Sequence, residues 1–163
     1  MQGLDLTREY AAKVALPELR RGLGDDAFSR IAVGSVGDGS DRCGFDDDVS
    51  RDHDWGVSLC VWACEGEQAL AASADQILRA LPSSYCGYPI LGFHAPVPQG
   101  RAGAWTVATH YAYFTGCAEG PRTLAEWART PEHALAAATN GDVFYDGQGD
   151  FSRIRERLLL GYP

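Results

Sequence analysis

The stretch GSDRCGFDDDVSRDHDWG, residues 39–56, decides the fold. It opens on a Gly-Ser pair and closes on two aspartates, Asp52 and Asp54, that a single histidine separates. Short apolar runs stand on either side of the stretch, at 31–36 and again up to residue 62. Because β-branched residues favour strands, we expect two strands joined by an acidic loop that contains glycine. The second strand is expected to begin at the aspartates and to cover 52–62.

The alternation along 52–62 predicts where the two aspartates point. Successive side chains of a strand point to opposite faces, so Asp52 and Asp54 share one face, and His53 and Trp55 share the other. We expect the face with His53 to lie in the core. Paired carboxylates supply the oxygen ligands that Mg²⁺ prefers, and they leave room for substrate phosphates. The pattern therefore predicts a Mg²⁺ or Mn²⁺ site at Asp52 and Asp54, the two residues expected to carry catalysis.

Candidate phosphate-binding residues come before the aspartates. Gly39 and Ser40 form a turn whose backbone N–H groups and hydroxyl can approach phosphate oxygens closely. Arg42 and Arg51 carry guanidinium groups, whose planar fork matches the geometry of a phosphate. Phosphoryl-type transfer depends mainly on positioning and on neutralising phosphate charge. We therefore expect these four residues to bind the phosphates of a substrate.

The remaining sequence predicts the elements around the two strands. Apolar residues repeat every three to four positions in several stretches, Thr123 and Glu126 form a capping-box pattern, and Pro131 suits the first turn of a helix. Helices are expected over 5–21, 67–81 and 151–160, from Thr123, and from Pro131 to Asn140. A third strand is expected over 105–114, a loop over 82–103 with one short strand near Ile90, and a short apolar segment over 143–145. An α+β domain that covers 1–163 follows.

Composition excludes several classes of protein. The chain has 163 residues, of which 45% are hydrophobic and 22% charged, and this suits one soluble globular domain. The formal net charge is −8, whereas duplex nucleic acid is usually bound by a basic face, so broad nucleic-acid binding is not expected. The five cysteines include no CxxC pair, which argues against a zinc knuckle or a disulfide framework. No apolar run reaches the ~18 residues of a membrane span, and no signal-peptide layout is present, so we expect a cytoplasmic protein without membrane contact.

The central stretch resembles a known enzyme superfamily. Gly39, Ser40, Gly44, Asp52 and Asp54 together match the signature of the nucleotidyltransferase superfamily typified by DNA polymerase beta. The run over 44–56 is similar to the bacterial family called domain of unknown function 4037. Later parts of the chain resemble the same family, namely Glu126-Trp127, Pro131-Glu132, the stretch 141–146 and the closing Arg-x-x-Leu-Leu helix.

The resemblance implies both a fold and an activity. The implied fold is a small nucleotidyltransferase-type mixed sheet with flanking helices. The implied activity is the Mg²⁺- or Mn²⁺-dependent transfer of a nucleoside monophosphate from a nucleoside triphosphate to a hydroxyl or amine acceptor. The expected partners are thus a nucleotide and a small-molecule acceptor, and a homodimer or a partner protein stays open. Members of the family usually continue into a helical second domain, which residues 1–163 do not include.

One carboxylate of the superfamily pattern is missing. The superfamily typically has a third carboxylate on a later strand, and the matching stretch here, 105–111, contains no acid. His110 is its nearest polar group and is the candidate for the third position, with Asp48 and Ser50 as accessory candidates in the loop. The missing acid keeps two alternatives open. One is a non-catalytic descendant that binds a partner, and the other is a site rebuilt for different chemistry on a small biosynthetic intermediate.

Overall fold

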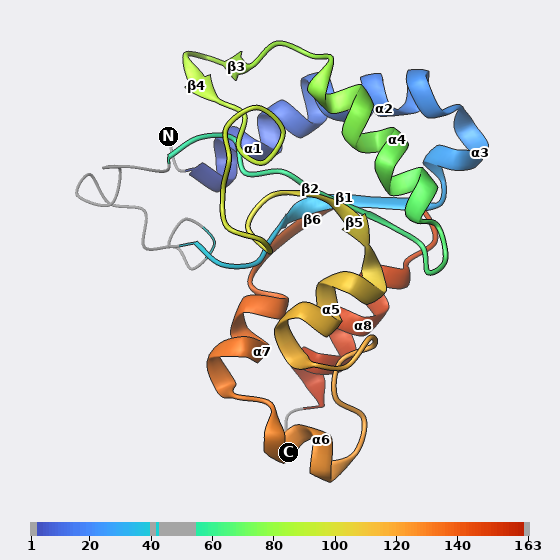
Figure 1. Cartoon of the computed structure of the whole chain (residues 1–163), viewed down its shortest axis with the longest axis vertical. Coiled ribbons are helices and arrows are strands. Elements are labelled where there is room, and N and C mark those ends of the chain that lie inside the picture. Colours follow the sequence, from blue (N-terminus) through green and yellow to red (C-terminus); the bar gives the residue numbers. More distant parts are fainter. Residues whose placement is uncertain (1–2, 40–41, 43–54, 162–163) are drawn as a thin grey trace.

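A four-stranded mixed sheet organises the chain (Figure 1). The computed structural model describes residues 3–39, 42 and 55–161. In the sheet, β1 pairs antiparallel with β2 and with β6, and β2 pairs parallel with β5, which gives the order β5-β2-β1-β6. The strands are β1 (Ile31–Val36), β2 (Cys60–Ala63), β5 (Gly103–Thr106) and β6 (Gly141–Asp146). The expected α+β class, a mixed sheet flanked by helices, is confirmed.

Helices cover both faces of this sheet, as Figure 1 shows. On one face lie α1 (Gly3–Tyr10), α2 (Leu16–Leu23) and α4 (Gln68–Arg79), and on the other lie α5 (Val107–Thr115), α7 (Glu132–Thr139) and α8 (Asp150–Leu160). The smaller elements are α3 (Asp25–Phe28), α6 (Leu124–Arg129), β3 (Ser84–Tyr85) and β4 (Tyr88–Pro89). Within the described residues, no helix is long and apolar enough to cross a membrane.

The sheet separates two hydrophobic cores, because successive side chains of a strand point to opposite faces. Along β1, Ile31 and Val33 pack into the core under α1, α2 and α4, whereas Ala32 and Val36 pack into the core with α5 and α8. The β2 residue Trp62 is fully buried in the second core and stacks on Phe151 of α8, with ring centroids 3.9 Å apart. Since both faces are covered, β1 and β2 are buried along their whole length, and Ser35 is their one polar residue.

The N-terminal helical run confirms the helix expected over 5–21, with one irregular turn. Between α1 and α2 the chain forms a π-helical turn, Ala11–Ala15, in which the Leu16 N–H donates to the Ala11 carbonyl. Pro17 follows directly and has no N–H to donate. The wider turn lets the helix pass into the proline, which a regular α-helix tolerates only in its first turn.

The predicted strand over 105–114 is wrong beyond its first residues. The strand β5 ends at Thr106, and α5 begins at Val107 with no connecting residue. The Thr106 hydroxyl accepts a hydrogen bond from the Thr109 N–H at 3.2 Å, which is the geometry of a helix N-cap. His110 therefore lies on a helix and not on a strand. The helical spacing of Val107, His110 and Tyr111, which are all buried, is the signal that a strand reading overlooks.

The predicted strand over 52–62 is also shorter than expected. The strand β2 begins only at Cys60, and residues 52–54 lie outside the described part of the chain. Just before β2, side chains take the backbone groups of Ser58: its N–H donates to the Thr7 hydroxyl at 3.0 Å, and its carbonyl accepts from the Ser35 hydroxyl at 2.8 Å. These groups are therefore not available to a β1 ladder at this position.

Most other predicted elements are confirmed. The helices expected over 67–81 and 151–160 correspond to α4 and α8, and the apolar segment at 143–145 is part of the edge strand β6. The loop over 82–103 contains the short hairpin of β3 and β4, and Ile90 forms an isolated bridge with Val57.

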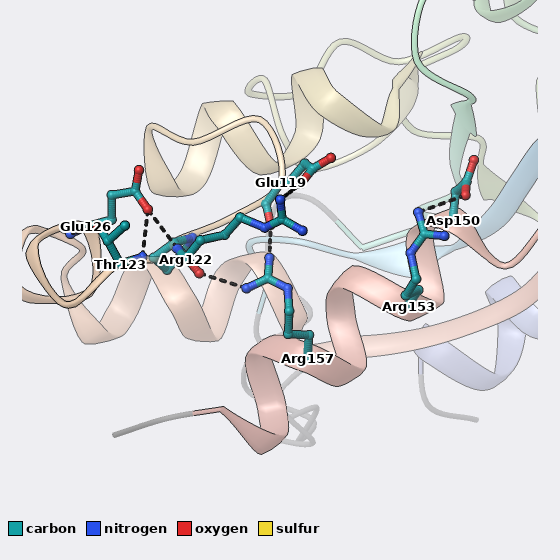
Figure 2. A network of polar contacts seen from close by, with 8 residues as sticks. Glu119, Arg122, Thr123, Glu126, Asp150, Arg153 and Arg157 are labelled. Atoms are coloured by element: carbon teal, nitrogen blue, oxygen red, sulfur yellow. Dashed lines mark hydrogen bonds and ion pairs between the residues drawn. The ribbon is translucent and has the colours of Figure 1, made fainter.

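The capping box at the start of α6 is present, since Thr123 and Glu126 each accept from the other's backbone N–H (Figure 2). Arg157 of α8 donates to the carbonyls of Glu119 and Pro121 and so fixes the loop before α6 (Figure 2).

Two buried tyrosines provide a matched test of the two cores. The Tyr10 hydroxyl is buried without a hydrogen-bond partner among the described residues, and burial raises its pKa to about 12. The Tyr111 hydroxyl donates to the Phe151 carbonyl at 3.0 Å. We expect Tyr10→Phe to leave the free energy of unfolding unchanged or to raise it by about 1 kcal/mol, and Tyr111→Phe to lower it by about 1 kcal/mol. Urea denaturation of both variants measures this, and equal losses would contradict it.

Candidate functional site

Two described candidate residues, Gly39 and Arg42, lie at one end of the sheet. At this end β1 finishes and β2 and β5 begin, because β1 runs antiparallel to β2 and β2 runs parallel to β5. Three of the candidates, Gly39, Arg42 and His110, are described. The other candidates lie outside the described residues, namely Ser40, Asp48, Ser50, Arg51, Asp52 and Asp54.

A buried arginine, Arg42, joins the segments that meet at this end. It is 5% exposed. Its Nε donates to the Ser35 hydroxyl at 3.0 Å, and its Nη2 donates to the Ser58 hydroxyl at 2.9 Å and to the Ser58 carbonyl at 3.2 Å. Further N–H groups donate to the carbonyls of Asp38 and Arg101. We call this set of contacts the Arg42 clamp. The guanidinium predicted to bind phosphate thus makes internal contacts with β1, the segment before β2 and the loop before β5.

The Arg42 clamp brings the two ends of the acidic segment together. Arg42 precedes the run that holds the predicted metal ligands, and Ser58 follows it four residues after Asp54. The side chains of Arg42 and Ser58 are in direct contact, so two residues that are 16 positions apart in the chain lie together. Closing a loop of this length costs chain entropy, which buried hydrogen bonds from a charged donor offset. The contact therefore fixes the position of Arg42 relative to Ser58, which stands four residues after Asp54 in the chain.

Glycines allow the loops of the site to pack closely. A side chain at Gly37, whose φ is +134°, would place its Cβ 2.2 Å from the Gly100 carbonyl oxygen. The Gly39 carbonyl accepts from the Arg42 N–H at 3.2 Å, which closes a turn around the clamp. This turn is the described part of the predicted phosphate-binding pair, and its position beside the end of β1 agrees with the strand-then-turn order expected from the sequence.

The other end of the acidic segment is held by the hairpin region. The Val57 N–H donates to the Pro89 carbonyl at 2.9 Å, and the Val57 carbonyl accepts from the Leu91 N–H at 2.8 Å. A Cβ at Gly56 would lie 2.5 Å from the Pro89 carbonyl oxygen, so this approach requires glycine. The residue that follows Asp54, Trp55, packs against the first core. The segment therefore enters and leaves the site at fixed points.

His110, the candidate for the third position, is a buried residue of the second core. Trp62 Nε1 donates to His110 Nδ1 at 3.2 Å, and His110 Nε2 donates to the Ala138 carbonyl at 3.2 Å. Burial lowers its pKa to about 3; the Ala138 hydrogen bond acts in the opposite direction and the charge of Arg42 in the same direction as burial. The ring is therefore neutral at physiological pH, and both of its nitrogens already have partners within the second core.

A carboxylate that is not among the candidate site residues lies at the same end of the sheet. Asp142 stands on β6, opposite Ser35 of β1. Its Oδ2 accepts from Arg8 Nη2 at 3.0 Å, and its Oδ1 accepts from the Val143 N–H at 2.9 Å. The pairing of β1 with β6 brings it there, and this pairing joins residues far apart in the sequence. Among the described residues, no group of three or more His, Cys, Asp or Glu side chains is arranged to hold a metal ion.

A separate groove of about 430 Å³ lies along the edge of the sheet. One wall is α4, with Gln68, Asp75 and Gln76, and the other is the junction of β5 and α5, with Trp105 and Thr109. Its volume is typical of a small-molecule pocket. It lies beside the last residues of β5, whereas the Arg42 clamp contacts Arg101 in the loop before β5, so the groove and the clamp are different places on the molecule.

Comparison with known proteins gives one match. The family model described as Domain of unknown function (DUF4037) matches residues 127–163. The matched part comprises the end of α6, then α7, β6 and α8, and it includes Asp142 and the arginines of α8. Neither the curated proteins nor the solved structures yielded a match. The resemblance to this family is therefore supported over the last quarter of the chain.

The Arg42 clamp predicts a large loss of stability when the guanidinium is replaced. Arg42→Lys retains the charge but lacks the planar fork that serves several acceptors together. We expect the free energy of unfolding to fall by about 3 kcal/mol, because buried oxygens of Ser58 and Arg101 lose their donors. Arg122→Lys is the control, since Arg122 is an exposed arginine whose ion pair with Glu119 contributes about 0.5 kcal/mol or less. Urea denaturation of the two variants should separate them clearly, and similar losses would contradict the clamp.

The buried neutral imidazole of His110 predicts a pH dependence of stability. Its pKa in the folded state is about 3 and in the unfolded state about 6.5. Below pH 6.5 the unfolded chain takes up a proton that the folded chain does not, so stability falls as the pH decreases towards 3. Between pH 7 and pH 5 this loss should reach about 2 kcal/mol.

His110→Gln removes the titrating group and keeps an amide that can donate to the Ala138 carbonyl. The free energy of unfolding of this variant, measured at pH 7 and pH 5 beside the natural chain, should fall by about 2 kcal/mol less over that interval. An identical decrease in both proteins would show that His110 is not the residue responsible.

Proposed function

We propose that this protein is a metal-dependent nucleotidyltransferase, which moves a nucleoside monophosphate from a nucleoside triphosphate to a hydroxyl or amine acceptor. The observation that carries the proposal is the Arg42 clamp. It joins the residue that follows the turn at Gly39 to Ser35 of β1 and to Ser58, four residues after Asp54 in the chain, and this supports the proposal. The nucleotidyltransferase-type resemblance of residues 39–56 and the mixed sheet with helices on both faces support the same activity.

Each residue has a defined part in the proposed reaction. Asp52 and Asp54 supply carboxylate oxygens, a donor set that suits Mg²⁺ or Mn²⁺. The bound ion would neutralise phosphate charge during the transfer. Gly39, Ser40 and Arg51 are proposed to contact the phosphates, whereas Arg42 holds the loop through its internal hydrogen bonds. In the reaction the acceptor oxygen or nitrogen bonds to the α-phosphorus, the bond from that phosphorus to diphosphate breaks, and the acceptor loses a proton.

A second function, nucleotide or metal binding without transfer, is favoured by one observation. The strand β5, which lies in the sheet next to β2, reads Gly103-Ala104-Trp105-Thr106 and contains no carboxylate. His110, the candidate for that position, is buried on α5 with both ring nitrogens bonded. A site with two carboxylates can bind a metal-nucleotide complex, and in this alternative the bound complex regulates contact with a partner.

Ligand-induced stabilisation tests the binding step that both functions require. We expect Mg²⁺ together with a nucleoside triphosphate to raise the melting temperature, because a ligand at 100 times its Kd adds about 2.7 kcal/mol to a fold that alone binds it. Asp54→Asn should abolish the shift. The control is Asp26→Asn on α3, an exposed acid next to the opposite end of β1. No shift with any of the four triphosphates, or an undiminished shift in Asp54→Asn, would contradict the proposal.

Transfer of a labelled α-phosphate to an acceptor distinguishes the transfer reaction from binding alone. A triphosphate labelled on its α-phosphate, incubated with Mn²⁺ and a set of hydroxyl and amine acceptors, should transfer label in the natural chain and not in Asp54→Asn. A thermal shift without transferred label would favour the binding function.

A further inference from the structure

We propose that the groove between α4 and β5 binds an extended, basic peptide segment of a partner protein, which pairs with β5 as a fifth strand of the sheet. The proposal involves only described residues and does not depend on the proposed function. The order β5-β2-β1-β6 leaves β5 at one edge of the sheet, with α4 on one face and α5 on the other (Figure 1). Such an edge is a template for pairing with another chain.

The backbone of β5 presents unpaired groups to the groove. The Gly103 N–H donates to the Leu59 carbonyl at 3.1 Å, so the backbone groups of Gly103 point towards the chain of β2. Since the backbone groups of successive strand residues point to opposite sides, those of Ala104 point away from β2. Outside the sheet, no described residue hydrogen-bonds to the Ala104 backbone. The backbone of an extended chain supplies both a donor and an acceptor at the spacing of a strand edge, and it is therefore the ligand that this pattern selects.

The opposite edge of the sheet is protected against such pairing, and the β5 edge is not. The edge strand β6 carries two acids, Asp142 and Asp146, and its register with β1 shifts between Val33 and Gly34. Charges and bulges are devices that prevent pairing at an edge. The four residues of β5 include no charge and no proline, and their register with β2 is regular. This edge is therefore open to another strand.

The walls of the groove suit side chains that alternate in character. Ala104 packs against the first core and Trp105 against the second, so the two faces of an added strand meet different surroundings. The α4 wall carries amide, carboxylate and methyl side chains, from Gln68, Ala71, Ala72, Asp75 and Gln76. The other wall carries the Trp105 indole and the Thr109 hydroxyl. A peptide that alternates polar and apolar side chains matches both walls.

Charge favours a basic segment over an acidic one. Among the described residues, Asp75 is the one charged residue that lines the groove. The formal net charge of −8 attracts basic chains at long range. Asp75 also accepts from Arg79 Nε at 2.7 Å. Arg79 in turn donates to the Phe93 carbonyl at 2.7 Å and to the Gly92 carbonyl at 3.2 Å, which ties α4 to the loop before β5 and preforms the groove.

A library of random heptapeptides displayed on phage provides the probe. Peptides selected on the natural chain should alternate polar and apolar residues and contain lysine or arginine. Ala72→Arg places a bulky positive charge on the α4 wall and should weaken their binding about 10-fold or more. Ala69→Arg is the matched control and should leave the affinity unchanged, because Ala69 is an exposed residue of the same helix that does not line the groove.

Pairing with β5 also predicts a pattern along the peptide backbone. Methylation of single backbone nitrogens in a selected peptide should abolish binding at every second position, because only alternate N–H groups of a strand point to one neighbour. Ala104→Pro removes the outward N–H of β5 and keeps the hydrogen bonds to β2, at a position where an edge strand tolerates proline. This variant should bind the selected peptides about 10-fold more weakly, since one backbone hydrogen bond is lost.

Fluorescence anisotropy of labelled peptides measures each affinity. The proposal is overturned if no peptide binds the natural chain more tightly than it binds the Ala72→Arg variant. Methylation with no effect at any position, or with equal effect at all positions, would equally exclude pairing with β5. If Ala104→Pro does not fold, the methylation pattern and the comparison of Ala72→Arg with Ala69→Arg decide.

Discussion

The guanidinium of Arg42 is the contact on which the arrangement of the site depends. Water hydrates a guanidinium well, so burying one is favourable only where oxygens replace that water in suitable directions. Here the oxygens come from β1, from the segment before β2 and from the loop before β5. None of these segments could move alone without leaving a buried donor or acceptor unpaired. The clamp therefore joins the end of β1, the segment before β2 and the loop before β5 into one platform.

The platform is attached to a sheet that is buried on both sides. Trp62 on one face of β2, and Val61 on the other, are both fully buried. Chemistry on this fold must then take place at the ends of the strands, because the faces are covered by helices (Figure 1). The end with the clamp combines a glycine turn, the attachment of the acidic segment and a carboxylate on β6. The hairpin that ends at Pro89 holds the chain after that segment, because the Val57 N–H donates to the Pro89 carbonyl.

The sequence predicted the fold where local physics dominates and missed it where long-range contacts decide. The helices α4 and α8 and the capping box at Thr123 follow from spacing and from side chains a few residues apart, so they could be read directly. The length of β2 could not, because it is set by Thr7, Ser35 and Arg42, which lie elsewhere in the chain and bind the backbone of Ser58. The stretch after Thr106 is ambiguous in another way, because its β-branched and aromatic residues also suit a strand. The hydrogen bond at the Thr106 cap and the helical spacing of the buried residues favour the helix that is observed. The internal hydrogen bonds of Arg42 could not be predicted, because the sequence does not distinguish a buried arginine from one that binds phosphate.

The position of β6 has a consequence for how the chain acquires its shape during synthesis. The strand β1 is central and pairs with β2, which follows soon after it, and with β6, which is made more than a hundred residues later. Until residue 146 has left the ribosome, one hydrogen-bonding side of β1 faces solvent, although both of its faces are apolar. A nascent chain of this length exposes an unpaired strand edge that favours association with other chains. The open edge of β1 is covered only when β6 has been synthesised and has paired with it. The end of the sheet at Ser35 and Asp142 is therefore formed late.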